Sequence, residues 1–313
     1  MALLHRMKSP KSKHNLRTIS DLVRHLSVSE GYLSELLDEF RSDETKLYRS
    51  WEEPKRSGGT RPIDAPKEKL KFIQKRINER ILQRTRIHNA AFGGVRGKRL
   101  RDNLQLHIGK PMVANFDLEQ FFPNITSKQV YRTFCGIGST PDVARVLTRL
   151  TTFKGRLPQG PPTSPMLANL VAGYGGRSCL DGRVDRLCKK HGSSYGRWID
   201  DITISGPKYL EKLKPTIERI IEQSGFKPNR SKGDFASNKK SQVVTRHLVN
   251  VKPNVKKDER RRLRVMLYKC RTKGGELHDK TRIRGKIAHI QSVNPELGTK
   301  FLKEFNSIEW SDK

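Results

Sequence analysis

Two adjacent aspartates stand between two β-forming runs in the segment RWIDDITIS, which spans Arg197 to Ser205. After the acids, Ile202 and Ile204 alternate with hydroxyl residues, a pattern typical of a strand with one buried face. The segment therefore predicts a β-hairpin with Asp200 and Asp201 at its tip. Like charges this close repel each other, so the pair is tolerated either as a solvated turn or beside a strongly positive partner such as a metal ion.

A third acid follows another β-forming run. In KPMVANFDLEQFFPNIT the apolar run from Met112 to Phe116 ends at Asp117, and Pro123 breaks the chain soon after. Taken alone, Asp117 can also be a helix N-cap. If it converges with the hairpin acids, the three carboxylates can hold two divalent cations that support an in-line displacement on a triphosphate. Mg²⁺ suits such a site because it prefers carboxylate and phosphate oxygens.

The charge balance indicates the partner. The chain of 313 residues has 64 Lys and Arg against 32 Asp and Glu, a formal net charge of +32 that is spread along its length. Such a field attracts polyanions, so nucleic acid is the expected partner, although a ribosomal-type structural protein or a merely basic soluble protein would share it. Composition alone does not separate binding from catalysis.

The remaining composition favours a globular protein of the cytosol. A hydrophobic share of 34% beside 31% charged residues is typical of a folded soluble chain. No apolar run approaches the roughly 20 residues of a membrane-spanning helix, and the N-terminal apolar stretch is too short for a secretory signal. The four cysteines form no C-x-x-C pair, which argues against a zinc knuckle and a disulfide framework. We therefore expect a cytoplasmic protein without a membrane partner.

Several local patterns predict secondary structure. SVSEGYLSELLDEF has helical spacing, with Ser27 and Glu30 fitting a capping box. EEPKRSGGTRPIDAP predicts a hairpin-like loop, and a basic amphipathic helix is expected over 70–81. FGGVRGKRLRDN is rich in glycine but lacks the residue order of a P-loop. From about Lys252 onward, the spacing predicts helices with faces dense in Arg and Lys.

Four motifs in order carry a resemblance to a known family. FDLEQFF, LPQGPPTSP, RWIDD and GFKPNRSK, within about Arg61 to Val251, resemble the reverse transcriptases, most closely the bacterial retron type. The resemblance implies an α+β right-hand polymerase with fingers, an antiparallel-sheet palm and a small helical thumb. The expected division is an N-terminal helical extension (1–50), fingers (51–110, with part of 140–160), a palm with the catalytic site (111–250) and a helical basic thumb (251–313).

The resemblance also implies roles for single residues. Asp117, Asp200 and Asp201 match the family's catalytic metal ligands, and the backbone carbonyl of Leu118 would add one more oxygen. Phe122 matches the aromatic steric gate that selects deoxynucleotides, with a plain core residue as the alternative.

Three further positions, with two neighbouring cations as helpers, match contacts to the incoming nucleotide. Gln159 matches a residue that lines the nucleotide and template, and Arg61 a cation that holds the triphosphate, with Lys55 and Arg56 as helpers. Lys232 matches a lysine near the leaving pyrophosphate, a candidate general acid. For these cations the alternative is a solvated basic face.

Two further marks resemble the retron type. DNLQLHIG resembles its Asn-Ala-x-x-His insertion, with Asn103 and His107 present and leucine in place of the alanine. VVTRHLV resembles the Val-Thr-Gly element, with Thr245 kept and Arg246 in place of the glycine. We expect these residues to contact the RNA or the template and primer, together with two arginines of the thumb, Arg261 and Arg264.

The hairpin itself departs from the family pattern. Trp198 and Ile199 stand where the family usually has tyrosine and alanine. The three acids are present although these other positions differ from the family pattern. The differences therefore bear on which RNA is recognised and on how DNA synthesis is primed.

The resemblance implies RNA-templated DNA synthesis from deoxynucleoside triphosphates with two Mg²⁺ ions, for which Mn²⁺ can substitute. A retron enzyme would use a structured noncoding RNA as template and primer and would make a branched RNA–DNA hybrid, msDNA, used in antiphage defence. A separate effector protein and host RNase H are the expected protein partners. The alternatives are another bacterial reverse transcriptase, defence-associated or intron-related, and a catalytically silent RNA-binding scaffold.

Overall fold

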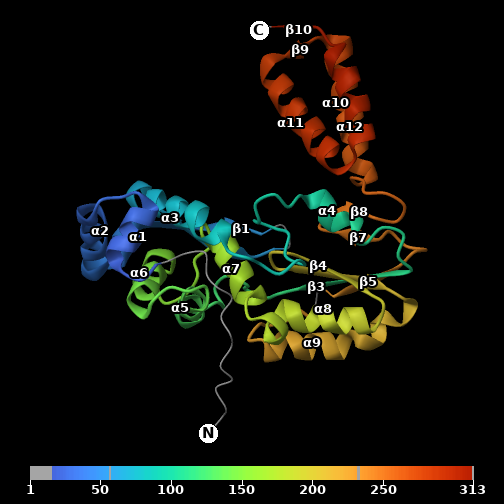
Figure 1. Ribbon diagram of the computed structural model, residues 1–313. Coiled ribbons are helices and arrows are strands. Elements are labelled where there is room, and N and C mark those ends of the chain that lie inside the picture. Colours follow the sequence, from blue (N-terminus) through green and yellow to red (C-terminus); the bar gives the residue numbers. More distant parts are fainter. Residues whose placement is uncertain (1–15, 56–57, 231–232, 312–313) are drawn as a thin grey trace. The chain divides into compact units, whose positions relative to one another are not determined.

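The computed structural model describes residues 16–55, 58–230 and 233–311 (Figure 1). Its chain divides into two compact units. Unit 1 comprises Met1–Arg96, Leu118–Arg186 and Glu218–Pro228. Unit 2 comprises Gly97–Asp117, Leu187–Ile217 and Asn229–Lys313. Two helices, α8 (Leu180–Lys190) and α9 (Lys214–Gln223), run from one unit into the other. Helices and antiparallel strands together form the α+β polymerase fold that the sequence predicts.

Unit 1 combines a β-hairpin with many short helices. Strands β1 (Tyr48–Pro54) and β2 (Thr60–Pro66) pair in antiparallel register, which confirms the expected hairpin. The helix expected over 70–81 is α3 (Glu68–Arg80), which buries Leu70, Ile73 and Ile77. The other helical elements in this unit are α1 (Ile19–Leu26), α2 (Glu30–Asp43), η1 (Glu44–Leu47), η2 (Leu82–Arg84), α5 (Ser127–Gly136), α6 (Pro141–Thr151), α7 (Ser164–Gly173) and η3 (Gly176–Ser178).

The predicted capping box at Ser27 and Glu30 is wrong by two residues. Helix α2 begins at Glu30, and its N-cap is Ser29, whose hydroxyl accepts a hydrogen bond from the backbone N–H of Tyr32. Ser27 instead ends the preceding helix α1, with a left-handed backbone at φ 50°. The helix predicted in this segment is therefore α2, and only its first residue was misplaced, because Ser27 and Ser29 both stand before the apolar run and both are residue types that favour an N-cap.

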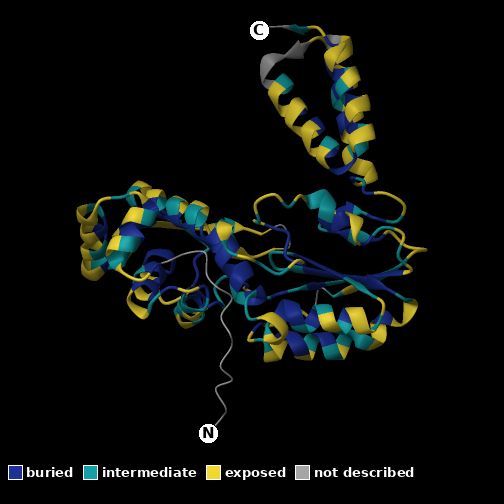
Figure 2. Cartoon of the chain, in the orientation of Figure 1, coloured by how far each residue is buried: buried dark blue, intermediate teal, exposed yellow. Residues whose placement is uncertain are grey.

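The centre of unit 2 is a four-stranded sheet with the order β4-β5-β3-β6. Its strands are β3 (Met112–Asp117), β4 (Ser194–Trp198), β5 (Asp201–Gly206) and β6 (Asp234–Ser237), and each neighbouring pair is antiparallel. Figure 2 shows β3, β4 and β5 as mostly buried, in keeping with their apolar runs. The hairpin predicted around the paired aspartates is therefore confirmed as β4 and β5.

Short elements extend unit 2 beside the sheet. They are α4 (Leu100–Gln105), η4 (Lys208–Leu213), β7 (Val243–Val244) and β8 (His247–Leu248). Leu104 of α4, Val113 of β3 and Val244 of β7 share one apolar cluster with Val249 and Val293. This cluster joins the sheet, the insertion that contains α4 and the end of α11 within one unit.

The C-terminal part of unit 2 is helical, as the sequence predicts. It contains α10 (Lys257–Lys273), α11 (Leu277–Val293) and α12 (Pro295–Asn306), with β9 (Gly275–Glu276) pairing in parallel with β10 (Trp310–Ser311). Leu263, Ile287 and Phe301 belong to its apolar core. Among the described residues, no helix is both long and apolar enough to cross a membrane.

Close packing of α12 on α11 depends on one glycine. A Cβ atom at Gly298 would lie 2.3 Å from the Cα of Gln291, so only glycine allows the two backbones to approach this far. Gly285, in the exposed interior of α11, has no atom within 4 Å of the same position.

These two glycines give a matched test of the helical packing. We expect Gly298→Ala to lower the free energy of unfolding by about 1–3 kcal/mol, because the methyl group must force the helices apart. Gly285→Ala should raise it by about 0.5–1 kcal/mol, because alanine loses less backbone entropy in a helix. Thermal or denaturant unfolding followed by circular dichroism measures both. Equal effects of the two substitutions would contradict the packing described.

Candidate active site

Two of the predicted acids are direct partners across neighbouring strands. Asp117 is the last residue of β3, Asp201 is the first of β5, and the antiparallel register pairs them. Partners of this kind have Cβ atoms about 4.5–5.5 Å apart on one face of the sheet. Asp200 precedes Asp201 in the turn that joins β4 to β5. The structure therefore brings the three aspartates together within unit 2, and each side chain is partly exposed.

The donor set fits magnesium. In residues 16–55, 58–230 and 233–311, no three carboxylate, imidazole or thiolate groups could hold a metal ion by themselves. Mg²⁺ does not need such a cage, because it is usually held by one or two carboxylates and completes its shell with water and substrate phosphates. The paired carboxylates of Asp117 and Asp201 meet that requirement with hard oxygen donors.

A buried arginine holds the tip of the hairpin. Ile199 has a left-handed backbone at φ 59°, which is unusual for a β-branched residue and costs on the order of 1–3 kcal/mol. Its carbonyl oxygen accepts a hydrogen bond of 2.7 Å from Nη1 of Arg197, whose side chain is fully buried. Arg197 therefore fixes the backbone of Ile199, the residue directly before Asp200.

An asparagine orients the acid on β3. Nδ2 of Asn229 donates to Oδ2 of Asp117 over 2.9 Å, and the backbone N–H of Asn229 donates to the carbonyl of Asp117 over 2.8 Å. A hydrogen bond to one carboxylate oxygen fixes the rotation of the group. The motif GFKPNRSK thus supports Asp117 through a residue that the sequence did not single out.

Leu118 and Phe122 lie in unit 1. Leu118 is 2% exposed and forms an isolated β-bridge with Pro228. Phe122 is partly exposed, and its ring lies 5.7 Å, edge to face, from the ring of Phe121, which is a core residue. Of the two adjacent rings, the one predicted as the steric gate is therefore the more accessible.

Arg61 and Gln159, predicted to contact the nucleotide, lie on neighbouring segments of unit 1. On β2, Nε of Arg61 donates to Oε2 of Glu53 over 2.9 Å, and the arginine side chain remains 43% exposed. Three residues further along β2, the N–H of Asp64 donates to the carbonyl of Gln159 over 2.8 Å. Gly160 follows with φ 132°, where a Cβ atom would approach the Asp64 carbonyl to 3.0 Å.

Two of the residues predicted to bind the nucleotide through a positive charge, Lys232 and Arg56, lie outside the described residues. Lys55 lies at the end of the β1–β2 hairpin, where its backbone N–H donates to the carbonyl of Gly59 over 2.9 Å.

Comparison with known proteins adds independent evidence. The sequence pattern of the family described as "Reverse transcriptase (RNA-dependent DNA polymerase)" matches residues 53–266. The retron Mx65 reverse transcriptase of Myxococcus xanthus is 31% identical over 301 residues, covering 90% of this chain and 69% of that protein. The retron Mx162 reverse transcriptase of the same organism is 29% identical, covering 85% of this chain and 62% of that protein. The retron Ec86 reverse transcriptase of Escherichia coli is 27% identical, with coverages of 80% and 77%.

The chain belongs to the retron-type reverse transcriptases. By family it is an RNA-directed DNA polymerase.

The retron-type insertion of this reverse transcriptase is buried in unit 2. Asn103 and His107 are 1% and 0% exposed, and Nδ1 of His107 lies 2.8 Å from Oγ of Ser205 on β5. A Cβ atom at Gly196 on β4 would lie 2.2 Å from Oδ1 of Asn103 and 3.0 Å from Nε2 of His107. Direct contact of Asn103 and His107 with RNA, as expected from the sequence, does not fit this burial. Both side chains instead support the β4–β5 hairpin from inside the protein.

The second retron mark forms the turn between β7 and β8. Thr245 and Arg246 have φ of 44° and 70°, and both are therefore in the left-handed region that favours glycine. The glycine that retron reverse transcriptases usually have at the second position suits this backbone, whereas Arg246 costs about 1–2 kcal/mol there. Arg246 is exposed and Thr245 is partly exposed, so both side chains are accessible to RNA, as the expected contact requires.

The two arginines predicted in the thumb lie on the exposed face of α10. Arg261 and Arg264 are both exposed, and the guanidinium of Arg264 lies 5.8 Å from the centre of the Phe301 ring. Leu263, which lies between them in the sequence, is buried in the helical core, whereas both arginines are exposed to solvent. This arrangement suits contacts with phosphates, which carry little sequence information.

The buried imidazole of His107 predicts a dependence of stability on pH. Burial lowers its pKa to about 3, below the ordinary value of 6.5, because the charged form loses its hydration inside the protein. The unfolded chain therefore binds the proton more readily, so the stability that neutral His107 contributes is present above about pH 6.5 and is lost below it.

Replacement by a side chain that does not titrate isolates this effect. Between about pH 8 and pH 5.5, the free energy of unfolding of the wild type should fall by about 1.4 kcal/mol more than that of His107→Gln. Urea unfolding at the two pH values measures the difference, and the other histidines cancel because both proteins contain them. Equal losses in the two proteins would show that the imidazole titrates as it does in water.

Proposed function

We propose that Asp117, Asp200 and Asp201 form the metal-binding centre of this polymerase, with two Mg²⁺ ions, or Mn²⁺ in their place. The observation that carries the proposal is the register that pairs Asp117 with Asp201 beside Asp200. Bound metal would lower the pKa of the primer hydroxyl and neutralise charge on the triphosphate. The backbone carbonyl of Leu118 is the further oxygen ligand that the family resemblance supports.

Residues around the acids keep them in position for this role. Asn229 fixes one oxygen of Asp117, and Arg197 fixes the strained backbone that enters Asp200. Preorganised carboxylates do not need to reorient when charge develops in the transition state, and that is a large part of catalysis by polar sites. Asn229 and Arg197 are positioning residues in this proposal.

The nucleotide contacts come from the residues that match the family motifs. Arg61 would exchange its contact with Glu53 for the triphosphate, because a phosphate presents more negative charge than one carboxylate. Gln159 would line the nucleotide and template, Phe122 would exclude a ribose 2′-hydroxyl, and Lys232 would donate a proton to the leaving pyrophosphate.

The similarity to retron enzymes supports a more specific reaction. The template and primer would be a structured noncoding RNA, the product a branched RNA–DNA hybrid, msDNA, and the setting antiphage defence in the cytoplasm with a separate effector protein and host RNase H. Residues 51–110, with part of 140–160, would act as fingers, 111–250 as palm and 251–313 as thumb, after an N-terminal extension over 1–50. The exposed Arg246, Arg261 and Arg264 would bind nucleic acid.

Removal of the paired charges tests the proposal. The gene is expressed with its flanking genomic DNA, and copurifying nucleic acid is run on a denaturing gel with and without RNase and DNase. We expect a species sensitive to both enzymes from the wild type and none from Asp200→Asn/Asp201→Asn. Primer extension by the variant should fall by about a thousandfold, which corresponds to a loss of about 4 kcal/mol in transition-state stabilisation.

A carboxylate on the same sheet provides the matched control. Asp234 on β6 is exposed, and its partner in the antiparallel register is Asn115 rather than any of the three aspartates. Asp234→Asn should retain both the product and the extension rate. Retained activity in the double variant would refute the metal-binding role. If the wild type is correctly folded but inactive, and the same amount of RNA copurifies with it and with the double variant, a catalytically silent RNA-binding scaffold would be favoured.

A further inference from the structure

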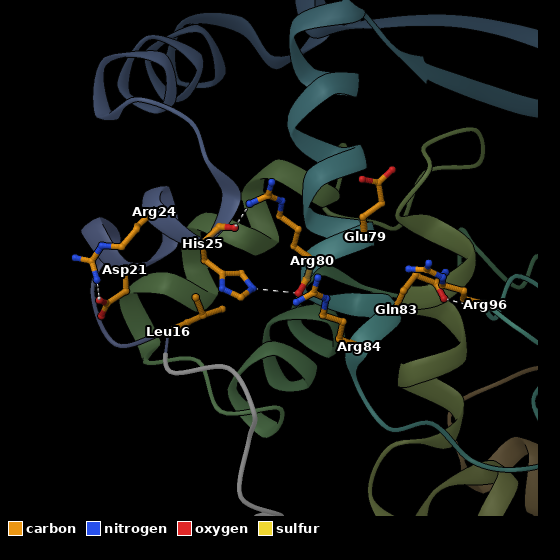
Figure 3. Close-up of a pocket in the computed structure, with 9 residues that line it drawn as sticks. All are labelled: Leu16, Asp21, Arg24, His25, Glu79, Arg80, Gln83, Arg84 and Arg96. Carbon is orange, nitrogen blue, oxygen red and sulfur yellow. Dashed lines mark hydrogen bonds and ion pairs between the residues drawn. The ribbon is translucent and has the colours of Figure 1, made fainter.

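A large basic pocket lies in unit 1, among residues to which no role is given above. Its volume is about 1190 Å³, and the residues that line it come from the segment before α1, from α1, α3 and η2, and from the segment after η2. Figure 3 shows their side chains around the opening. The charged groups are four arginines against two carboxylates; they are Arg24, Arg80, Arg84, Arg96, Asp21 and Glu79.

The walls of the pocket are held by hydrogen bonds between distant segments. Nη1 of Arg80 donates to the carbonyl of His25 over 2.9 Å, and Nε2 of His25 lies 3.0 Å from the carbonyl of Arg80 (Figure 3). The same Nη1 also donates to Oγ of Ser27. On the other side, Oε1 of Gln83 accepts from the N–H of Arg96 over 2.8 Å. Its Nε2 donates to the carbonyl of Gly94 over 2.9 Å. The backbone that presents the arginines is therefore fixed before any ligand arrives.

Two of the arginines carry charge that none of the described residues neutralises. Arg84 and Arg96 are exposed, and neither guanidinium makes a hydrogen bond or an ion pair within the described part of the chain. Asp21 is already engaged, because hydrogen bonds from Thr18 and Arg17, with Arg24 nearby, hold its pKa below the usual range. Glu79 is exposed and lies on α3, so it leaves an excess of positive charge around the opening.

We propose that this pocket is a second nucleic-acid site, which binds the backbone phosphates of single-stranded RNA through Arg84 and Arg96. Guanidinium groups bind phosphate oxygens in pairs of parallel hydrogen bonds, which suits an arginine that has no internal partner. A volume above 1000 Å³ exceeds what one phosphate needs and leaves room for consecutive nucleotides. The site would hold RNA independently of the carboxylates in unit 2.

The dependence of binding on salt tests this proposal. Each phosphate contact with a single strand contributes about 0.7 to the slope of log Kd against log salt concentration, so Arg84→Gln/Arg96→Gln should lower the slope for oligouridylate by about 1.4. The control, Lys75→Gln/Arg132→Gln, removes the same charge from exposed residues of unit 1 that do not line the pocket. It should leave the slope nearly unchanged.

The outcomes separate this site from the polymerase centre and from a protein partner. Fluorescence anisotropy measures binding without catalysis, so inactivity in primer extension would count against the metal centre and leave the RNA result intact. Equal slopes for the pocket variant and the wild type would overturn the proposal, as would an equal decrease in the control. Selective loss of polyglutamate binding with unchanged oligouridylate binding would also overturn it and indicate an acidic protein instead.

Discussion

The repulsion between carboxylates at the ends of β3 and β5 is the constraint on which the rest of the site depends. Like charges directly opposite each other destabilise an antiparallel pair, and a third acid in the adjoining turn adds to the cost. The apolar strands behind Asp117 and Asp201 supply the opposing free energy, since Phe116, Ile202 and Ile204 are fully or almost fully buried. Burial on one sheet thus holds together groups that would otherwise separate, and divalent cations would relieve the repulsion.

Buried polar groups beneath the hairpin make the same sheet specific. Asn103 and His107 fill the space that a side chain at Gly196 would occupy, and His107 also contacts Ser205. A one-residue slip of β4 would bring a side chain into this space and reverse the faces of the strand. The retron-type insertion therefore acts on the hairpin by packing and hydrogen bonding. Its influence on the aspartates is indirect, through the register of the strands that carry them.

The sequence predicted the parts of the site that follow from local pattern. Alternation after Asp201 indicated β5, the apolar run before Asp117 indicated β3, and the order of motifs indicated the family. It did not reveal Asn229 or Arg197, because an asparagine after a proline and an arginine in a basic chain carry no distinguishing local signal. The burial of Asn103 was missed for a related reason: a polar residue is expected outside unless its tertiary partners are known. The pocket around Arg84 and Arg96 depends on segments far apart in sequence, so no local pattern could show it.

The proposed metal centre requires that the three aspartates bind divalent metal as a unit. Electron paramagnetic resonance of Mn²⁺, titrated into the protein with a template–primer and a matching nucleotide that cannot be extended, counts the bound ions directly. We expect two tightly bound ions per molecule in the wild type, as a two-metal site requires, and a loss of tight binding in Asp117→Asn. Undiminished binding of both ions by Asp117→Asn, with the fold intact by circular dichroism, would contradict it.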